Sequence, residues 1–290
     1  MNAVTDTLRA VLASRPIGSI LVDQGRLSAE SAERIVALQE KKGLRFGDAA
    51  LQLGLLTEDD IQIALAEQFE FPYLQPGDER VSEEVVAAFK PFTPIAEQLR
   101  ALRSQLRLRW LDQEAGRKII AVVSAGQGEG RSFVAANLAV VFAQLGEHTL
   151  LVDADLRNPR QHELFRRDNR IGLSSVLAGR AHLQDAASRI SGLPGLTFLR
   201  AGPKAPNPQE LLGRPVFKAM MAFARKKYDV VVVDTPDGSA TADVQTIAAS
   251  AHGVIVVARR DVTATGRLQA LVSSLQQSGI PVVGSVLNNG

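Results

Sequence analysis

Residues 119–132 read IIAVVSAGQGEGRS, and this stretch decides the fold of most of the chain. An unbroken apolar run predicts a buried strand, and glycines at 126, 128 and 130 follow it directly. Such glycines let backbone N–H groups turn toward an anion at the start of the next helix. The segment 125–132 therefore fits a Walker A phosphate-binding loop, with alanine for its first glycine and arginine for its lysine. A plain strand-to-helix turn is the alternative.

The loop lies in a long region, 94–290, where apolar runs alternate with helical patterns. Strands are expected at 118–123, 149–153, 196–200, 229–234, 253–258 and 281–286, and helices at 132–145, 215–227, 241–250 and 264–278. Continuous apolar strands such as VVVVD (230–234) are typical of a parallel sheet covered on both faces. We therefore predict an α/β fold with a doubly wound, mostly parallel sheet, and ligands at the carboxyl ends of its strands.

Acidic residues stand where two further strands should end. The run LLVDADLR places Asp153 and Asp155 after the second strand, and VVVVDTP places Asp234 at the end of another. Carboxylates two apart lie on one side of an extended backbone, and carboxylate oxygens suit Mg²⁺. Each aspartate alone could be a strand-end turn residue. Three of them beside one glycine loop predict a nucleotide site, with Ser132, Asp155 and Asp234 as Mg²⁺ ligands.

The order of these motifs resembles the bacterial tyrosine kinases that accompany polysaccharide chain-length regulators, in particular the EpsG-like type. These are deviant Walker P-loop NTPases, related to MinD and ParA. The resemblance covers 94–290. It implies an ATP- and Mg²⁺-dependent kinase with Asp153, Asp155, Asp234 and Arg131 in catalysis. It also implies ATP or ADP binding by Gly126, Gln127, Gly128, Glu129, Gly130, Arg131, Ser132, Arg157 and Asn288.

The helix pattern EQLRALR matches the segment through which this family assembles into rings, so Glu97, Arg100 and Arg103 are predicted to mediate oligomerisation. A solvated, salt-bridged helix face is the alternative. The expected partner is the cytoplasmic tail of an inner-membrane polysaccharide co-polymerase. Nucleic-acid binding by this basic helix is not expected, since only one aromatic residue, Trp110, accompanies it.

Two departures from the family matter. Arg131 replaces the lysine that reaches the β- and γ-phosphates, and arginine is bulkier and planar. The family's tyrosine-rich tail has no counterpart before Gly290, and the only tyrosines are Tyr73 and Tyr228. A kinase acting on another protein and a nucleotide-dependent assembly switch both remain open. A spatial-organising ATPase is disfavoured, because Gly126 stands where those enzymes carry a signature lysine.

The first 75 residues contain a repeat. Residues 17–39 align without gaps onto 46–68, and each copy predicts a short helix, a glycine and a second helix capped by Ser28 or Thr57. The repeat resembles the N-terminal domain of type II secretion ATPases, which implies a cyclic di-GMP site. The residues that match it are Arg15, Gly18, Gly25, Gln39, Arg45, Gly47, Leu51, Gly54 and Gln68. A helical adaptor without ligand is the alternative.

Charge divides the chain in the same place. Residues 1–93 hold 9 Lys/Arg against 15 Asp/Glu, whereas 94–290 hold 24 against 16. We expect an all-helical domain at 1–75, a linker at 76–93 with a short helix near 82–89, and the P-loop domain at 94–290. With no cysteine, no signal pattern and no 18-residue apolar run, the chain is expected to be cytoplasmic, held at the inner membrane by its partner.

Overall fold

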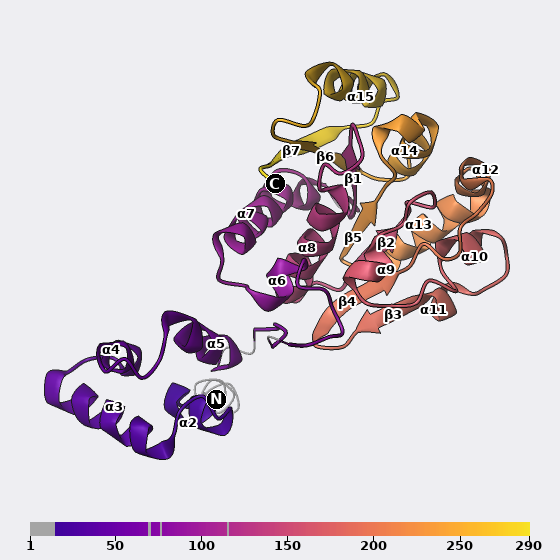
Figure 1. Ribbon diagram of the computed structural model, residues 1–290. Helices are drawn as coiled ribbons and strands as arrows, with labels where there is room; N and C mark the ends of the chain where they lie inside the picture. The colour runs from indigo at the N-terminus through magenta and orange to yellow at the C-terminus, as the bar shows by residue number, and fades with distance from the viewer. Residues whose placement is uncertain (1–14, 69–70, 76, 115) are drawn as a thin grey trace, which may run out of the picture. The chain divides into compact units, whose positions relative to one another are not determined.

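The computed structural model describes residues 15–68, 71–75, 77–114 and 116–290. It divides into two compact units, Met1–Pro72 and Tyr73–Gly290, and each is described here by itself (Figure 1).

The larger unit is built on a seven-stranded sheet in the order β3-β4-β2-β5-β1-β6-β7. Its strands are β1 (Ile119–Ser124), β2 (Thr149–Asp153), β3 (Ala187–Ile190), β4 (Leu193–Leu199), β5 (Val230–Asp234), β6 (Gly253–Arg259) and β7 (Val282–Asn288). All neighbours are parallel except β3 and β4. The predicted α/β fold with a mostly parallel sheet is therefore confirmed.

Helices cover both faces of the sheet (Figure 1). One face carries α6 (Val86–Phe89), α7 (Pro94–Arg109) and α8 (Arg131–Gln144). The other carries α10 (Leu173–Leu177), α12 (Pro208–Leu212), α13 (Pro215–Lys227), α14 (Thr241–Ala248) and α15 (Thr265–Gln277). Strand β1 shows why: Ile120 and Val122 enter the first core, and Ile119, Ala121 and Val123 the second. Shorter elements complete the unit: η1 (Leu111–Gln113), α9 (Gln161–Leu164), α11 (Leu183–Ala186) and η2 (Gly238–Ala240).

The edge strand β3 is absent from the sequence prediction. It has four residues and pairs antiparallel with β4, with an irregularity between Arg189 and Ile190. A run this short carries no recognisable alternation, so its pairing follows from the neighbouring strand rather than from its own sequence.

Part of the segment expected to be a linker contributes to the first core. Val81, Val85 and Phe89 are buried there, and the α8 side chains Asn137 and Gln144 bind the backbone of this segment. Apolar side chains at these positions gain free energy by leaving water. The expected short helix is present as α6, and 81–89 packs as a part of the P-loop unit.

The smaller unit consists of α2 (Ile17–Asp23), α3 (Ala29–Lys42), α4 (Phe46–Gln52) and α5 (Glu58–Gln68). The repeat organises it, and the two copies pack mainly on each other: α2 packs chiefly on α5, and α3 on α4. Ile20, Leu21, Ile35 and Ala64 belong to the core that the two copies share. Among the described residues, no helix of either unit has the length and apolarity needed to cross a bilayer.

Candidate functional site: a glycine loop beside three buried carboxylates

The predicted phosphate loop joins β1 to α8 and lines a hollow of about 210 Å³. Gly128 and Gly130 have φ of 75° and 94°, a backbone region that favours glycine. A Cβ on Gly130 would also stand 2.2 Å from Nδ2 of Asn288. The loop residues that line the hollow are Gln127, Gly128, Glu129, Gly130, Arg131 and Ser132.

Several side chains stabilise the conformation of this loop. Asn288, at the end of β7, donates to the Glu129 carbonyl (3.1 Å), and Arg259, at the end of β6, donates to the Gly128 carbonyl (3.1 Å). The Glu129 carboxylate turns back and accepts the backbone N–H of Ala125 (3.0 Å). The backbone N–H groups of 126–130, in contrast to that of Ala125, donate to no acceptor within the described chain. The loop is held in shape while these donors stay available to an anion.

A second hollow, of about 530 Å³, begins on the other side of the loop. It shares Gly128 and Gly130 with the first and extends along Asn288, Arg259 and the α7 side chain Leu99. It therefore offers an apolar wall with polar groups next to the phosphate loop, as a nucleoside requires.

The three predicted carboxylates do meet beside the loop, and the sheet explains why. Strands β2 and β5 are parallel neighbours in which Asp153 pairs directly with Asp234, and Asp155 follows two residues later. All three are buried, with exposed fractions of 0%, 0% and 2%. Burial, reinforced by the charges of Asp234 and Asp155, raises the pKa of Asp153 well above its ordinary range. Burial also raises the pKa of Asp155.

Backbone amides stabilise the first two carboxylates. Asp153 accepts the N–H groups of Asp155 (3.2 Å) and Gln161 (3.1 Å) on its two oxygens. Oδ1 of Asp155 accepts the N–H groups of Arg157 (3.1 Å) and Asn158 (2.9 Å). The turn after β2 therefore folds around its own aspartates and fixes their orientation. Of the three carboxylates, only Asp155 lines the hollow.

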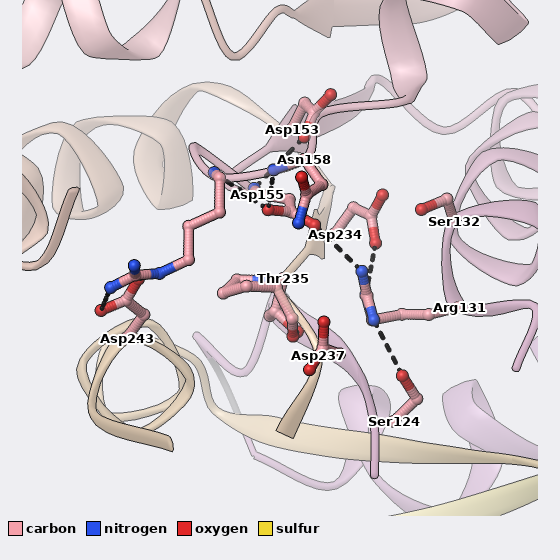
Figure 2. A network of polar contacts seen from close by, with 12 residues as sticks. Ser124, Arg131, Ser132, Asp153, Asp155, Asn158, Asp234, Thr235, Asp237 and Asp243 are labelled. Carbon is pink, nitrogen blue, oxygen red and sulfur yellow. Dashed lines mark hydrogen bonds and ion pairs between the residues drawn. The ribbon is translucent and has the colours of Figure 1, made fainter. Parts of the chain in front are cut away.

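Figure 2 shows Arg131 lying among these carboxylates. Its Nε donates to Asp234 (3.2 Å), its Nη2 to Asp155 (3.1 Å) and its Nη1 to the hydroxyl of Ser124 (2.8 Å). Its exposed fraction is 8%, so this is a buried guanidinium bridging two buried acids. The planar fork suits two carboxylates in a way that a lysine ammonium would not. The side chain predicted to hold phosphate is engaged elsewhere.

Gln161, at the start of α9, is a residue of this network that sequence reasoning did not single out. It is fully buried, and its Nε2 donates to Asp234 (2.8 Å) and to the carbonyl of Ser132 (2.9 Å). Its Oε1 is buried with no hydrogen-bond partner among the described residues. The signal in the sequence was a polar residue at the first position of a short helix following DADLR, which by itself fits a surface turn equally well.

The donor set is chemically suited to Mg²⁺, since carboxylate and hydroxyl oxygens are its preferred protein ligands. The arrangement is closed, however. Each oxygen of Asp153, Asp155 and Asp234 already accepts a hydrogen bond from the chain. Within the described ranges, acidic and histidine side chains form no group of three able to hold a metal ion. Mg²⁺ held by Ser132, Asp155 and Asp234 would therefore compete with Arg131 for the two carboxylates.

The remaining residues predicted for the P-loop unit have other contacts. Arg157 pairs with Asp243 of α14 (2.7 Å). On α7, Arg100 pairs with Glu97, and Arg103 donates to the Val141 carbonyl of α8 (2.7 Å). Arg103 therefore joins α7 to α8 within the unit by a hydrogen bond. Its role in oligomerisation stays a prediction.

In the helical unit, Gly25 and Gly54 adopt the same positive φ (69° and 63°) at matching places of the two copies. Arg15 pairs with Asp23, and Gln68 donates to the Arg15 carbonyl (3.0 Å). The other residues predicted for cyclic di-GMP are Gly18 in α2, Gln39 in α3, Arg45 before α4, and Gly47 and Leu51 in α4.

Comparisons with known proteins agree with this geometry. A family model described as an AAA domain matches residues 117–280, more than half of the chain. The tyrosine-protein kinase YwqD of Bacillus subtilis is 35% identical over 209 residues, which cover 72% of this chain and 87% of YwqD. The solved kinase domain of the Escherichia coli tyrosine kinase ETK is 32% identical, with a TM-score of 0.67. That match covers 71% of this chain and 79% of the ETK domain.

A relative from Ralstonia solanacearum, EpsB, which is also named as a tyrosine-protein kinase, is 37% identical over 198 residues. The match covers 68% of this chain but only 26% of EpsB. The chain thus spans about a quarter of the length of that larger relative.

Proposed function

Because this chain belongs to the P-loop family of bacterial tyrosine-protein kinases, we propose that it is an ATP- and Mg²⁺-dependent protein-tyrosine kinase of exopolysaccharide production, of the EpsG-like type. The observation that carries the proposal is the convergence of Asp153, Asp155 and Asp234 beside the glycine loop. Such a site would position a phosphoryl group in the loop and hold beside it the Mg²⁺ that stabilises its charge, and these are the main tasks in phosphoryl transfer.

Different residues of the site would bind the nucleotide and accept the proton. The free N–H groups of 126–130 would bind the phosphates, and the second hollow would take the nucleoside. Asp153, whose pKa is raised by burial, would accept the proton of the tyrosine hydroxyl. Mg²⁺, when bound, would offset the charge of the phosphates. Asp153 is fully buried and does not line the hollow, so this role requires the site to open.

The acceptor is proposed to lie in another protein. Tyr228 is buried, with an exposed fraction of 8%, so it is a poor acceptor. The family resemblance points to a membrane co-polymerase as the partner, and we propose that its cytoplasmic tail completes the site at the inner membrane.

The direct test is transfer of labelled phosphate from ATP to a tyrosine-containing copolymer in the presence of Mg²⁺. We expect measurable transfer by the native protein and a loss of at least about 100-fold in Asp153→Ala, because general-base groups contribute about 10²–10⁴. ATP affinity, measured separately by calorimetry, should change by less than about threefold. Equal transfer by the variant would remove Asp153 from catalysis.

A nucleotide-dependent assembly switch is the second candidate, and one observation favours it: Arg131 is bound to carboxylates instead of reaching into the loop. The variant Arg131→Lys distinguishes the two. A kinase should gain rate when the compact ammonium is restored. If native protein and variant both bind ATP but neither labels tyrosine, the switch is the better description.

The cyclic di-GMP prediction concerns the helical unit alone and is tested separately. Arg45→Ala should weaken binding of labelled cyclic di-GMP at least tenfold, because guanidinium groups contact guanine and phosphate. Lys41→Ala, which removes an exposed charge from the end of α3, serves as the control. If the native protein does not bind the dinucleotide, the unit is an adaptor.

A further inference from the structure

The charge balance at the carboxylates suggests how the site is kept in its closed form. Three buried acids in one place repel one another, and an unpaired buried charge is strongly destabilising. Arg131 is the cationic side chain that donates to two of them, Asp155 and Asp234. Its guanidinium therefore offsets the repulsion that a divalent metal would otherwise offset.

Gln161 completes this arrangement from the other side of Asp234. Arg131 occupies Oδ1 of that carboxylate, and Gln161 occupies Oδ2. The same Gln161 amide also donates to the Ser132 carbonyl, at the start of α8. Asp234 is thus held between the loop helix and α9, with both oxygens turned to protein donors.

The side-chain oxygen of Gln161 gives a reason for a second arrangement of the site. Its Oε1 is buried and has no partner among the described residues. Leaving a buried acceptor unsatisfied costs about 1–3 kcal/mol. A rearrangement that gives this oxygen a donor would recover that free energy.

We propose that Arg131 and Gln161 form an internal latch in which the Arg131 guanidinium is the resident cation of the carboxylate cluster. Without nucleotide the protein binds divalent metal weakly, because the metal must displace Arg131 from Asp155 and Asp234. A triphosphate in the loop offers the guanidinium a competing anion at the start of the same helix. Arg131 then leaves the carboxylates, and the metal enters with the nucleotide. The nucleotide step rests on the proposed function, whereas metal exclusion by Arg131 does not.

The test measures Mn²⁺ affinity of nucleotide-free protein by electron paramagnetic resonance of the unbound ion. Arg131→Gln should bind Mn²⁺ at least tenfold more tightly than the native protein. Arg131→Lys should gain less, since an ammonium contacts one carboxylate as a point charge. Gln161→Leu should gain about threefold by freeing one oxygen of Asp234. The native protein should bind Mn²⁺ at least tenfold more tightly once a non-hydrolysable ATP analogue is present.

Arg107→Gln is the matched control. Arg107 also bridges two carboxylates, Asp112 and Glu147, but on the surface of the unit and outside the lining of the hollow. Its loss removes the same charge and should leave Mn²⁺ affinity unchanged.

Equal Mn²⁺ affinity in native protein and Arg131→Gln would overturn the latch, as would an equal gain in the Arg107 control. If Arg131→Gln fails to fold by circular dichroism, Arg131→Lys decides: unchanged affinity in that variant overturns the proposal. The proposed function is judged separately. If tyrosine is labelled but native protein and Arg131 variants bind Mn²⁺ equally, only the latch is overturned. If the variants bind Mn²⁺ tightly but no tyrosine is labelled, only the kinase proposal is overturned.

Discussion

Asp153 shows how a single residue of the site can work against the stability of the fold. Its carboxyl group is fully buried near two other acids, and its hydrogen-bond donors in the described chain are the backbone N–H groups of Asp155 and Gln161. Groups held in such surroundings are typical of functional sites, where stability is commonly given up for chemistry.

This burial predicts a pH-dependent gain in stability for Asp153→Asn. Because burial raises the pKa of the folded Asp153, the folded state is favoured while the group is protonated. That stability is present below the unfolded pKa and is lost as pH rises toward the folded pKa. An asparagine does not titrate. The melting temperature of Asp153→Asn minus that of the native protein should therefore be larger at pH 8 than at pH 5. Each kcal/mol corresponds to about 2–4 °C.

Thermal unfolding of both proteins at the two pH values checks this. Asp112→Asn, which removes a half-exposed acid at the surface, serves as the control. A native-to-variant difference that is the same at pH 5 and pH 8 would contradict the pKa assigned to Asp153.

Among the elements, α8 links the site to the core. It begins with Arg131 and Ser132, packs on the sheet along its length, and binds the segment 81–89 through two polar side chains. Asn137 accepts the N–H of Ala87 (2.9 Å) and donates to the Glu84 carbonyl (3.1 Å). Gln144 donates to the Ala87 carbonyl (2.8 Å). The helix thus supplies hydrogen bonds to a backbone that itself forms a turn between Ser82 and Val85 and the four-residue α6.

We predict that Asn137→Ala lowers the free energy of unfolding by about 2–3 kcal/mol. The substitution leaves the buried N–H of Ala87 without its acceptor and also removes a donor to Glu84. Urea unfolding followed by circular dichroism measures the change. Ser104→Ala on α7, which removes only an exposed hydroxyl contact, should stay within about 0.5 kcal/mol. A loss no larger than that of the control would show that α8 does not hold the segment.

Considered as a whole molecule, the chain consists of two units with separate cores. The helical unit depends on both copies of its repeat, because α2 packs on α5 and α3 on α4. Neither copy alone buries its apolar face. The P-loop unit begins at Tyr73, ahead of the glycine loop by more than 50 residues, since 81–89 contributes side chains to its core.

This division predicts different outcomes for two truncations. A fragment of 73–290 should unfold cooperatively and retain ATP binding. A fragment of 94–290 loses Val81, Val85 and Phe89 from the core, each contributing about 1.5–3 kcal/mol by burial. Its melting temperature should therefore be lower by at least about 10 °C. Calorimetric scans of both fragments measure this, and equal melting temperatures would show that 76–93 is only a linker.

The sequence by itself determined six of the seven strands and the place of the site. Apolar runs such as 119–123 and 230–233 predict buried strands, because periodicity and burial are written in neighbouring residues. It followed that Asp153 and Asp234 stand at the same edge of the sheet as the glycine loop. The direct pairing of these two aspartates required only that their strands be neighbours.

Tertiary structure decided the state of that site. The carboxylates that Arg131 contacts, Asp155 and Asp234, lie 24 and 103 positions further along the chain. Gln161 and Asp234, which share a hydrogen bond, are 73 positions apart. A motif fixes where a long side chain begins, but its direction depends on which charges the fold brings within reach. The same holds for β3 and for the cross-packed repeat, since their partners lie on other elements. The loop was predicted from its glycines; its closure by an arginine was visible only in the assembled fold.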